Sequence, residues 1–214
     1  MAVALVIGAS RGIGLETVRC ALAAGHRVRA LARGAAGIGI EHAQLERVSA
    51  DALNRAAVTR ALEGADAVIE TLGAPQDMRT VVWGTQLFSA ATRILIDAMR
   101  ERGVLRLLAV TGLGAGDSRG HGGLLYDTIA FPLVLKRIYD DKDVQEQMIR
   151  ASGLDWTIVR PGLLRGGPAT GRARALTNPK DWTGGSVTRA DVADFLVREA
   201  FERRFVGQTP LLIE

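Results

Sequence analysis

Short apolar runs alternate along this chain with longer segments in which apolar residues recur every three or four positions. A continuous apolar run is typical of a strand covered on both faces of a sheet, and the wider spacing is typical of a helix that covers such a sheet. The runs predict strands at 3–8, 27–32, 44–48, 66–72, 106–111 and 156–160, and a closing edge strand at 209–213. The spaced segments predict helices at 13–24, 54–62, 86–102, 124–137 and 140–152, and a last one from Thr188 or Asp191 to about Arg203.

Strands and helices that alternate in this way predict a doubly wound parallel sheet between two helical layers, the α/β/α Rossmann fold. A length of 214 residues suits one such domain, and the chain shows no repeat, low-complexity tract or linker. We therefore expect a single domain over 1–214. Two segments without regular pattern, the glycine-rich 112–124 and the irregular 163–185, are expected to cap a bound substrate.

The first predicted strand leads into a glycine-rich turn, Gly8-Ala9-Ser10-Arg11-Gly12-Ile13-Gly14, from which a helix begins. In a parallel sheet, ligands bind at the carboxyl ends of the strands, beside the first of them. A side chain at position 8, 12 or 14 would obstruct the sharp turn, the approach of a pyrophosphate or the packing of helix on strand. The backbone N–H groups and the positive end of the helix then face the phosphates. The turn therefore predicts a dinucleotide site.

Composition and charge limit the partners and the kinds of site that this protein can have. The formal net charge is +4, but the basic residues are scattered, so we expect no nucleic-acid partner. No apolar stretch approaches the roughly 18 residues of a membrane span, and no secretory leader is evident, so we expect a cytoplasmic protein that contacts no membrane. Cys20 is the one cysteine, expected as a buried and inert thiol, and the three histidines lie too far apart in sequence to predict a metal site. A monomer and a homodimer stay open.

The end of the second predicted strand indicates which dinucleotide binds. An acid there would pair with the ribose hydroxyls of NAD, but the position 19 residues after Gly14 is Arg33, and no acid occurs between 31 and 40. A guanidinium pairs well with the 2′-phosphate of NADPH, and Arg11 in the turn is a second cation. We therefore expect NADPH in preference to NADH, with a solvated Arg33 as the alternative. The missing acid also argues against an S-adenosylmethionine methyltransferase.

The spacing Gly-x3-Gly-x-Gly resembles the short-chain dehydrogenase/reductase superfamily, and the resemblance covers nearly the whole chain. The stretches 142–146, 151–162 and 188–193 look like its atypical branch, which includes NmrA-like proteins and biliverdin and flavin reductases. The resemblance implies contacts from Asp51 to the adenine and from Gly73 to the ribose side. The cofactor-binding positions that we expect are Gly8, Ser10, Arg11, Gly12, Ile13, Gly14, Arg33, Asp51, Ala52, Leu72, Gly73, Thr111, Lys142, Pro161 and Leu163.

The catalytic pair of the superfamily, Tyr-x3-Lys, is not present in its usual form. If Lys142 takes the lysine position, the residue four before it is Ile138, and Tyr139 is one residue too late, which rotates it by about 100° on a helix. Lys142 can still bind the ribose, the alternative being a surface lysine in an acidic cluster. Tyr139 stays a candidate catalytic or pocket-lining residue.

Other candidate residues follow the fifth predicted strand. Thr111 ends it, where the superfamily has a serine or threonine that orients a carbonyl or the nicotinamide amide; the alternative is an ordinary threonine at a strand end. His121 is the one histidine placed to reach a substrate, the alternative being a solvent-exposed loop histidine, which most loop histidines are. Tyr126 is expected to line the pocket or to pack.

Three functions remain open. The first is an NADPH-dependent reductase that transfers hydride to a small conjugated acceptor such as a flavin or quinone, for which orientation matters more than a strong protein acid. The second is a non-catalytic, NmrA-like sensor that binds the dinucleotide and reports redox state. The third is a sugar-nucleotide epimerase or dehydratase, for which the chain lacks the expected substrate lobe. The compact chain favours the first, and the displaced tyrosine favours the second.

Overall fold

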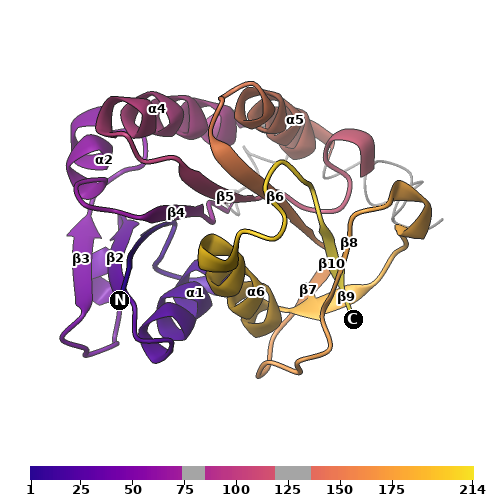
Figure 1. Cartoon of the computed structure of the whole chain (residues 1–214), viewed down its shortest axis with the longest axis horizontal. Helices are drawn as coiled ribbons and strands as arrows, with labels where there is room; N and C mark the ends of the chain where they lie inside the picture. The colour runs from indigo at the N-terminus through magenta and orange to yellow at the C-terminus, as the bar shows by residue number, and fades with distance from the viewer. Residues whose placement is uncertain (74–84, 119–135) are drawn as a thin grey trace.

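The computed structural model describes residues 1–73, 85–118 and 136–214 (Figure 1). The strands are β1 (Val3–Ile7), β2 (Arg27–Ala32), β3 (Leu45–Ser49), β4 (Ala67–Glu70), β5 (Arg106–Val110), β6 (Asp155–Pro161), β7 (Leu163–Arg165), β8 (Arg174–Leu176), β9 (Ser186–Thr188) and β10 (Leu211–Ile213). The α-helices are α1 (Gly12–Ala23), α2 (Arg55–Ala61), α4 (Leu87–Arg102), α5 (Lys136–Arg150) and α6 (Arg189–Glu202).

The main sheet has eight strands in the order β3-β2-β1-β4-β5-β6-β10-β8 within the described residues. All neighbours are parallel except β10 and β8, which run antiparallel. The order of the strands therefore reverses at β1: the sheet first grows to β2 and β3 on one side and then to β4, β5 and β6 on the other. A doubly wound Rossmann sheet has this arrangement, and the predicted fold class is confirmed. The expectation that 209–213 forms the edge strand is wrong, because β8 pairs with the outer side of β10.

The segment 163–185 is more ordered than its sequence indicates. It contains β7 and β8, and β7 pairs in parallel with β9 in a small second sheet. The prediction of an irregular segment is wrong because these strands have three residues each, too few to show a periodic pattern, and their pairing partners come from distant parts of the chain.

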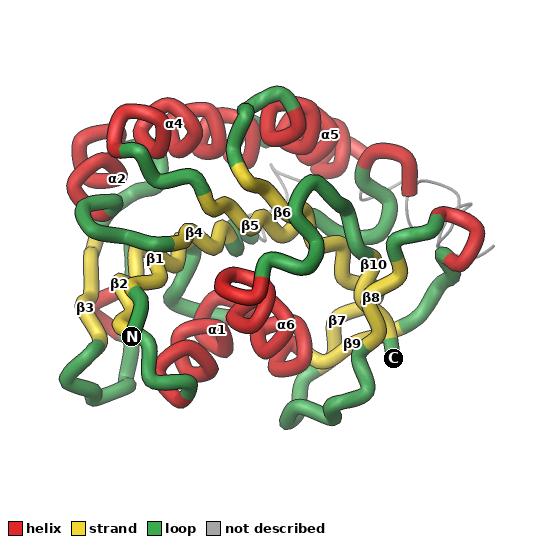
Figure 2. Tube along the Cα trace, viewed as in Figure 1, coloured by secondary structure: helices red, strands yellow, loops and turns green. Residues whose placement is uncertain are grey.

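Helices cover both faces of the sheet, as Figure 2 shows: α2, α4 and α5 lie on one face, and α1 and α6 on the other. Alternate side chains of the central strands feed these two layers. Val68 of β4 packs in the core beneath α4, whereas Ile69 packs in the core beneath α6. The continuous apolar runs of the sequence result from this two-sided burial.

Two of the predicted helix starts, those of α2 and α6, are confirmed by their capping side chains. The Asn54 side chain accepts a hydrogen bond from the backbone N–H of Ala57 at the start of α2, and the Thr188 hydroxyl accepts one from that of Asp191 at the start of α6. The helix predicted at 140–152 begins at Lys136 instead. The helix predicted at 124–137 lies outside the described residues, apart from its last two.

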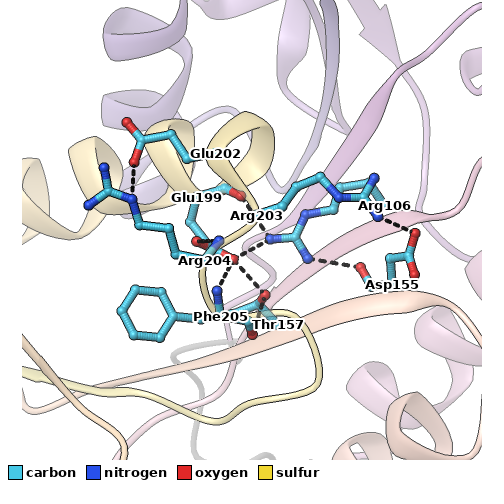
Figure 3. A network of polar contacts seen from close by, with 8 residues as sticks. All are labelled: Arg106, Asp155, Thr157, Glu199, Glu202, Arg203, Arg204 and Phe205. Atoms are coloured by element: carbon cyan, nitrogen blue, oxygen red, sulfur yellow. Dashed lines mark hydrogen bonds and ion pairs between the residues drawn. The ribbon is translucent and has the colours of Figure 1, made fainter.

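A buried ion pair holds the amino end of β5 against α6 (Figure 3). Arg106 and Glu199 are each 2% exposed, and their side chains meet at 2.6 Å. The Glu199 carboxylate also accepts hydrogen bonds from the Thr157 hydroxyl (3.1 Å) and from the backbone N–H groups of Arg204 and Phe205 (2.9 Å each). The pair thereby fastens the segment after α6 to the sheet.

Candidate functional site

The turn between β1 and α1 brings two strands and a helix into direct contact. Gly8 has a positive φ of 86°, and a Cβ there would lie 2.8 Å from the carbonyl oxygen of Thr71, which follows β4. A Cβ on Gly14, in the first turn of α1, would lie 2.6 Å from the Thr71 hydroxyl and 2.9 Å from the carbonyl carbon of Gly8. These two positions have no room for a side chain, which is the packing reason expected for both glycines.

Among the described residues, the start of α1 faces open space. Arg11 stands at the N-cap position in an extended conformation, and no side-chain cap and no acid in the first turn occupies the free N–H groups. Gly12 has a φ of 58°, and a Cβ there would meet no described atom within 4 Å. Free N–H groups, the positive end of the helix dipole and open space form a fitting site for an anion. The residues present thus fit the pyrophosphate of a dinucleotide.

The end of β2 lies beside this turn. A Cβ on Gly34 would be 3.8 Å from the Cβ of Ser10, which places Arg33 next to the glycine turn. Arg33 and Arg11 are both exposed, and neither pairs with a carboxylate among the described residues. Two uncommitted guanidinium groups therefore lie at the side of the turn where the sequence predicts a 2′-phosphate.

Of the cofactor-binding residues expected after β3 and β4, some have a structural role and others are accessible to a ligand. Asp51 is half-buried, and its carboxylate accepts the backbone N–H of Leu53 at 2.9 Å, which shapes the turn before α2. Ala52 is 8% exposed and packs in the core. Leu72 is half-buried and Gly73 exposed beside the glycine turn. Ile13, in the first turn of α1, is half-buried against the core beneath α6.

Thr111 is hydrogen-bonded to a buried ion pair between Glu146 and Arg160. Its hydroxyl donates to Glu146 at 2.8 Å, and the same carboxylate accepts two hydrogen bonds from Arg160, at 3.0 and 2.6 Å. Burial works against the charge of Arg160, yet the hydrogen bonds and charges of Glu146 and Asp117 raise its pKa. Because the Thr111 hydroxyl donates its hydrogen bond to Glu146, it can serve a ligand here only as a hydrogen-bond acceptor. The sequence pattern did not indicate this role of Glu146, which lies in the stretch 142–146.

Lys142 is buried at the end of β5, so the alternative of a surface lysine is wrong. It is 7% exposed, its Nζ lies 3.3 Å from the carbonyl oxygen of Val110, and the ammonium stands 4.2 Å from the centre of the Phe88 ring. The ring face and the carbonyl oxygen both attract a cation. The strand end at which the sequence expects cofactor contacts therefore contains a positive charge.

Tyr139 reaches the same strand end despite its offset. A Cβ on Gly112 would lie 2.7 Å from the Tyr139 hydroxyl, so that hydroxyl lies directly against the chain after β5. Ile138, at the position four before Lys142, is half-buried. The structure thus brings Tyr139, Lys142 and Thr111 together at one end of the sheet. His121 and Tyr126 lie outside the described residues.

The loop after β6 passes close to its neighbours. Gly162 has no space for a Cβ, which would lie 2.9 Å from a methyl group of Ile213. Pro161 is buried, and its carbonyl accepts the N–H of Leu113 at 3.0 Å. Leu163, in contrast, is 71% exposed. A large apolar side chain left open at this end of the sheet is available to a flat apolar ligand.

Glu70 is a second residue whose role the sequence pattern did not indicate. It ends β4, is 1% exposed and lies one residue from the Thr71 wall of the glycine turn. Burial raises its pKa to about 7, although hydrogen bonds from Thr92 and Gln145 oppose that rise. A carboxylate that closes an otherwise apolar strand, Ala67-Val68-Ile69-Glu70, was the available signal.

The glycine turn, the open start of α1 and the strand order together define a dinucleotide-binding protein of the Rossmann class. The chain belongs to the NAD(P)H-binding family, which matches residues 8–203. That span begins at Gly8 and includes the ends of β2, β4, β5 and β6. The predicted resemblance to NAD(P)-binding, atypical short-chain dehydrogenases/reductases is confirmed.

Solved structures and a curated relative agree with this family. ChuY, an anaerobilin reductase from Escherichia coli O157:H7, is 31% identical, with 99% of this chain and 97% of that chain covered and a TM-score of 0.79. YhfK of Bacillus subtilis (strain 168), described as an uncharacterized sugar epimerase, is 29% identical over 187 residues, or 83% of this chain and 78% of that protein. A short-chain dehydrogenase/reductase from Veillonella parvula DSM 2008 in complex with NADP is 14% identical, covers 99% and 94% of the two chains, and has a TM-score of 0.80. This last likeness shows the fold alone.

Across residues 1–73, 85–118 and 136–214, none of the helices has both the length and the apolar character that crossing a membrane requires.

Proposed function

We propose that this protein is an NADPH-dependent reductase that transfers hydride to a small conjugated acceptor, such as a flavin, a quinone or a bilin. The observation that carries the proposal is the uncapped start of α1 beside Gly12, with Arg33 and Arg11 at its edge, which pair with no carboxylate among the described residues. A bound NADPH supplies the hydride from its nicotinamide ring.

The residues around the site have distinct tasks in this proposal. The N–H groups of the first turn of α1 bind the pyrophosphate, and Arg33 with Arg11 binds the 2′-phosphate. Lys142, on α5, donates to the ribose from its position against the end of β5. Tyr139 supplies the proton that the reduced acceptor requires, and the exposed Leu163 covers one face of the acceptor.

Two observations support an acceptor of the conjugated kind. ChuY, at 31% identity over nearly the full length of both chains, is named an anaerobilin reductase. At the end of β5, the Thr111 hydroxyl and the Glu146 carboxylate are hydrogen-bonded to each other and are not free to act on an acceptor. Hydride transfer to a conjugated acceptor depends mainly on stacking and orientation, which this site can provide.

The test is to mix the protein with NADPH and a panel of flavins, quinones, biliverdin and anaerobilin and to follow the absorbance of the reduced nicotinamide. We expect oxidation of NADPH with at least one acceptor and a lower rate in Tyr139→Phe. Tight NADPH binding without oxidation by any acceptor would favour the sensor instead. The commitment of the Thr111 proton to Glu146 is the observation on the side of that second candidate.

Cofactor choice is tested by charge reversal at the end of β2. Arg33→Asp should weaken NADPH binding at least about tenfold, equivalent to about 1.4 kcal/mol, and leave NADH binding nearly unchanged. Arg27→Asp is the matched control, because Arg27 is exposed at the other end of the same strand. Equal losses for the two dinucleotides in Arg33→Asp would contradict the 2′-phosphate assignment.

The epimerase alternative rests on the name of the relative YhfK. Sugar nucleotides are therefore included in the panel, with interconversion of epimers as the readout. Conversion of a sugar nucleotide with no net change in the reduced nicotinamide would replace the reductase proposal.

A further inference from the structure

A buried polar cluster, which comprises Glu70, Thr92, Gln145 and Lys142, lies between the ends of β4 and β5 and the helices α4 and α5. The four side chains range from fully buried to 7% exposed. Glu70 pairs in register with Ala109 of β5, and the ammonium of Lys142 contacts the carbonyl of the next residue, Val110. The carboxylate and the ammonium therefore occupy neighbouring strand ends.

Uncharged donors hold the Glu70 carboxylate. The Thr92 hydroxyl lies 2.9 and 2.8 Å from its two oxygens, and the Gln145 amide donates to it at 3.2 Å and to the Thr92 hydroxyl at 3.0 Å. The Gln145 carbonyl oxygen is buried without a hydrogen-bond partner among the described residues. These contacts orient Glu70 but leave its charge uncompensated.

Three carboxylates act on Lys142: Glu70 from β4, and Glu146 and Asp141 from α5 itself. The group of α4 that faces the ammonium is the neutral ring of Phe88. Two of the three carboxylates have other partners.

Glu146 forms the ion pair with Arg160 at 2.6 Å. Asp141 accepts the backbone N–H groups of Phe88 and Ser89 at the start of α4, at 2.9 and 3.3 Å. Glu70, by contrast, has no cation within hydrogen-bonding distance among the described residues, so Lys142 is the charge that faces it.

Burial disfavours the charged form of both Glu70 and Lys142, so the charge of each depends on the other. It lowers the pKa of Lys142 to about 8, against the pull of the three carboxylates, and it raises the pKa of Glu70 to about 7. A lysine in this range changes its charge near neutral pH, so the state of one neighbouring carboxylate decides how much ammonium is present.

We propose that Glu70 is the counter-ion of Lys142 and thereby sets the pH range in which Lys142 is charged at the edge of the dinucleotide site. Glu70 is a positioning residue, because it acts on the cofactor only through Lys142. The inference rests on the proposed function in assigning Lys142 to the ribose. It extends that function by making cofactor affinity depend on a carboxylate that the cofactor does not touch.

The experiment reads the titration of Lys142 directly. The chain has three lysines, at 136, 142 and 180, so ¹³C-lysine labelling gives few signals, and Lys142→Arg identifies the one that matters. The wild-type signal should titrate near pH 8, far below an ordinary lysine. In Glu70→Gln its midpoint should move down by about one pH unit or more, the effect of removing a nearby opposite charge.

Two further variants serve as a matched control and as a second test of Glu70. Glu101→Gln removes an exposed carboxylate at the far end of α4 and should leave the Lys142 midpoint in place. Thr92→Val removes the hydroxyl that stabilises the Glu70 anion and should move the midpoint in the same direction by less, which gives a test even if Glu70→Gln does not fold. An unchanged midpoint in folded Glu70→Gln, or in Thr92→Val if the first variant does not fold, would overturn the proposal.

NADPH binding supplies the functional readout. The dissociation constant should rise above the Lys142 midpoint, and in Glu70→Gln this rise should begin at lower pH. A binding profile that stays in place while the midpoint moves would also overturn the proposal, since the pair would then be structural. Neither measurement requires turnover, so failure of every acceptor would refute the reductase proposal alone.

Discussion

Two glycine-to-alanine substitutions in the first turn of α1 separate the packing of the glycine turn from its ligand site. In an ordinary helix, alanine is more favourable than glycine by about 1 kcal/mol. At Gly14 the added Cβ would lie 2.6 Å from the Thr71 hydroxyl and 2.9 Å from the Gly8 carbonyl carbon. The Thr71 hydroxyl is itself held by the carbonyl of Ile7 at 2.9 Å, so neither neighbour can move freely.

Relieving this overlap requires α1 to move away from β1. Overpacking of this kind costs about 3 kcal/mol at the upper end of the usual range, which exceeds the gain in helix propensity. We expect Gly14→Ala to lower the free energy of unfolding by about 2 kcal/mol and to lose dinucleotide affinity as well.

Gly12→Ala is the contrasting change. Its Cβ meets no described atom within 4 Å, but the residue has a φ of 58°, so alanine there costs about 1 kcal/mol for the left-handed conformation. Its methyl group would lie in the space that we assign to the pyrophosphate. We therefore expect a small loss of stability with a rise of at least about tenfold in the NADPH dissociation constant.

Urea unfolding and NADPH titration of both variants provide the measurements. We expect stability to fall more in Gly14→Ala, whereas in Gly12→Ala the loss of affinity should outweigh the loss of stability. A Gly14→Ala protein more stable than wild type would refute the steric argument, since helix propensity alone would then decide. Unchanged NADPH affinity in Gly12→Ala would contradict the position assigned to the pyrophosphate.

Three further substitutions test other parts of the structure. Glu199→Ala should lower the free energy of unfolding by about 3–5 kcal/mol, measured in urea, because it leaves a buried arginine uncompensated, and Glu199→Gln should cost less. Asp191→Asn should speed proteolysis at the loop around Thr170 and Gly171, because the carboxylate accepts both of their N–H groups, at 2.8 to 3.0 Å; an unchanged cleavage rate would contradict this role. Glu70→Gln should flatten the pH dependence of unfolding: the fold raises the pKa of this carboxyl to about 7, so wild type loses up to about 3 kcal/mol as pH rises from about 5 to about 8, and a parallel profile in the variant would refute the assignment.

The central strands and the helix starts could be predicted because their causes are local. A strand buried on both faces must be apolar throughout, as 3–8 and 106–111 are, and a capping side chain such as Asn54 precedes its helix by one position. The glycine turn could be predicted for the same reason, since three glycines at fixed spacing reflect contacts within a few residues of each other and with one adjacent strand.

The features that the sequence did not indicate depend on contacts between distant segments. β8 pairs with β10 although residues 177–210 lie between them in the sequence, and three-residue strands have no periodicity to detect. Spacing alone argued against Tyr139, but it treated α5 as an isolated helix and could not include the close approach of Gly112. The importance of Glu70 arises only when α4 and α5 supply Thr92 and Gln145.

The ion pair of Figure 3 lies at the amino ends of β5 and β6, whereas the proposed chemistry lies at their carboxyl ends. The two are separated by the length of a strand of five residues, roughly 16 Å. Substitutions that retune the acceptor pocket around Leu163 therefore need not disturb the contacts that hold the last helix to the sheet. For an engineer, this separation makes the chain a scaffold on which acceptor choice can be altered while the framework is left alone, and a lineage of such proteins could change acceptors by the same route.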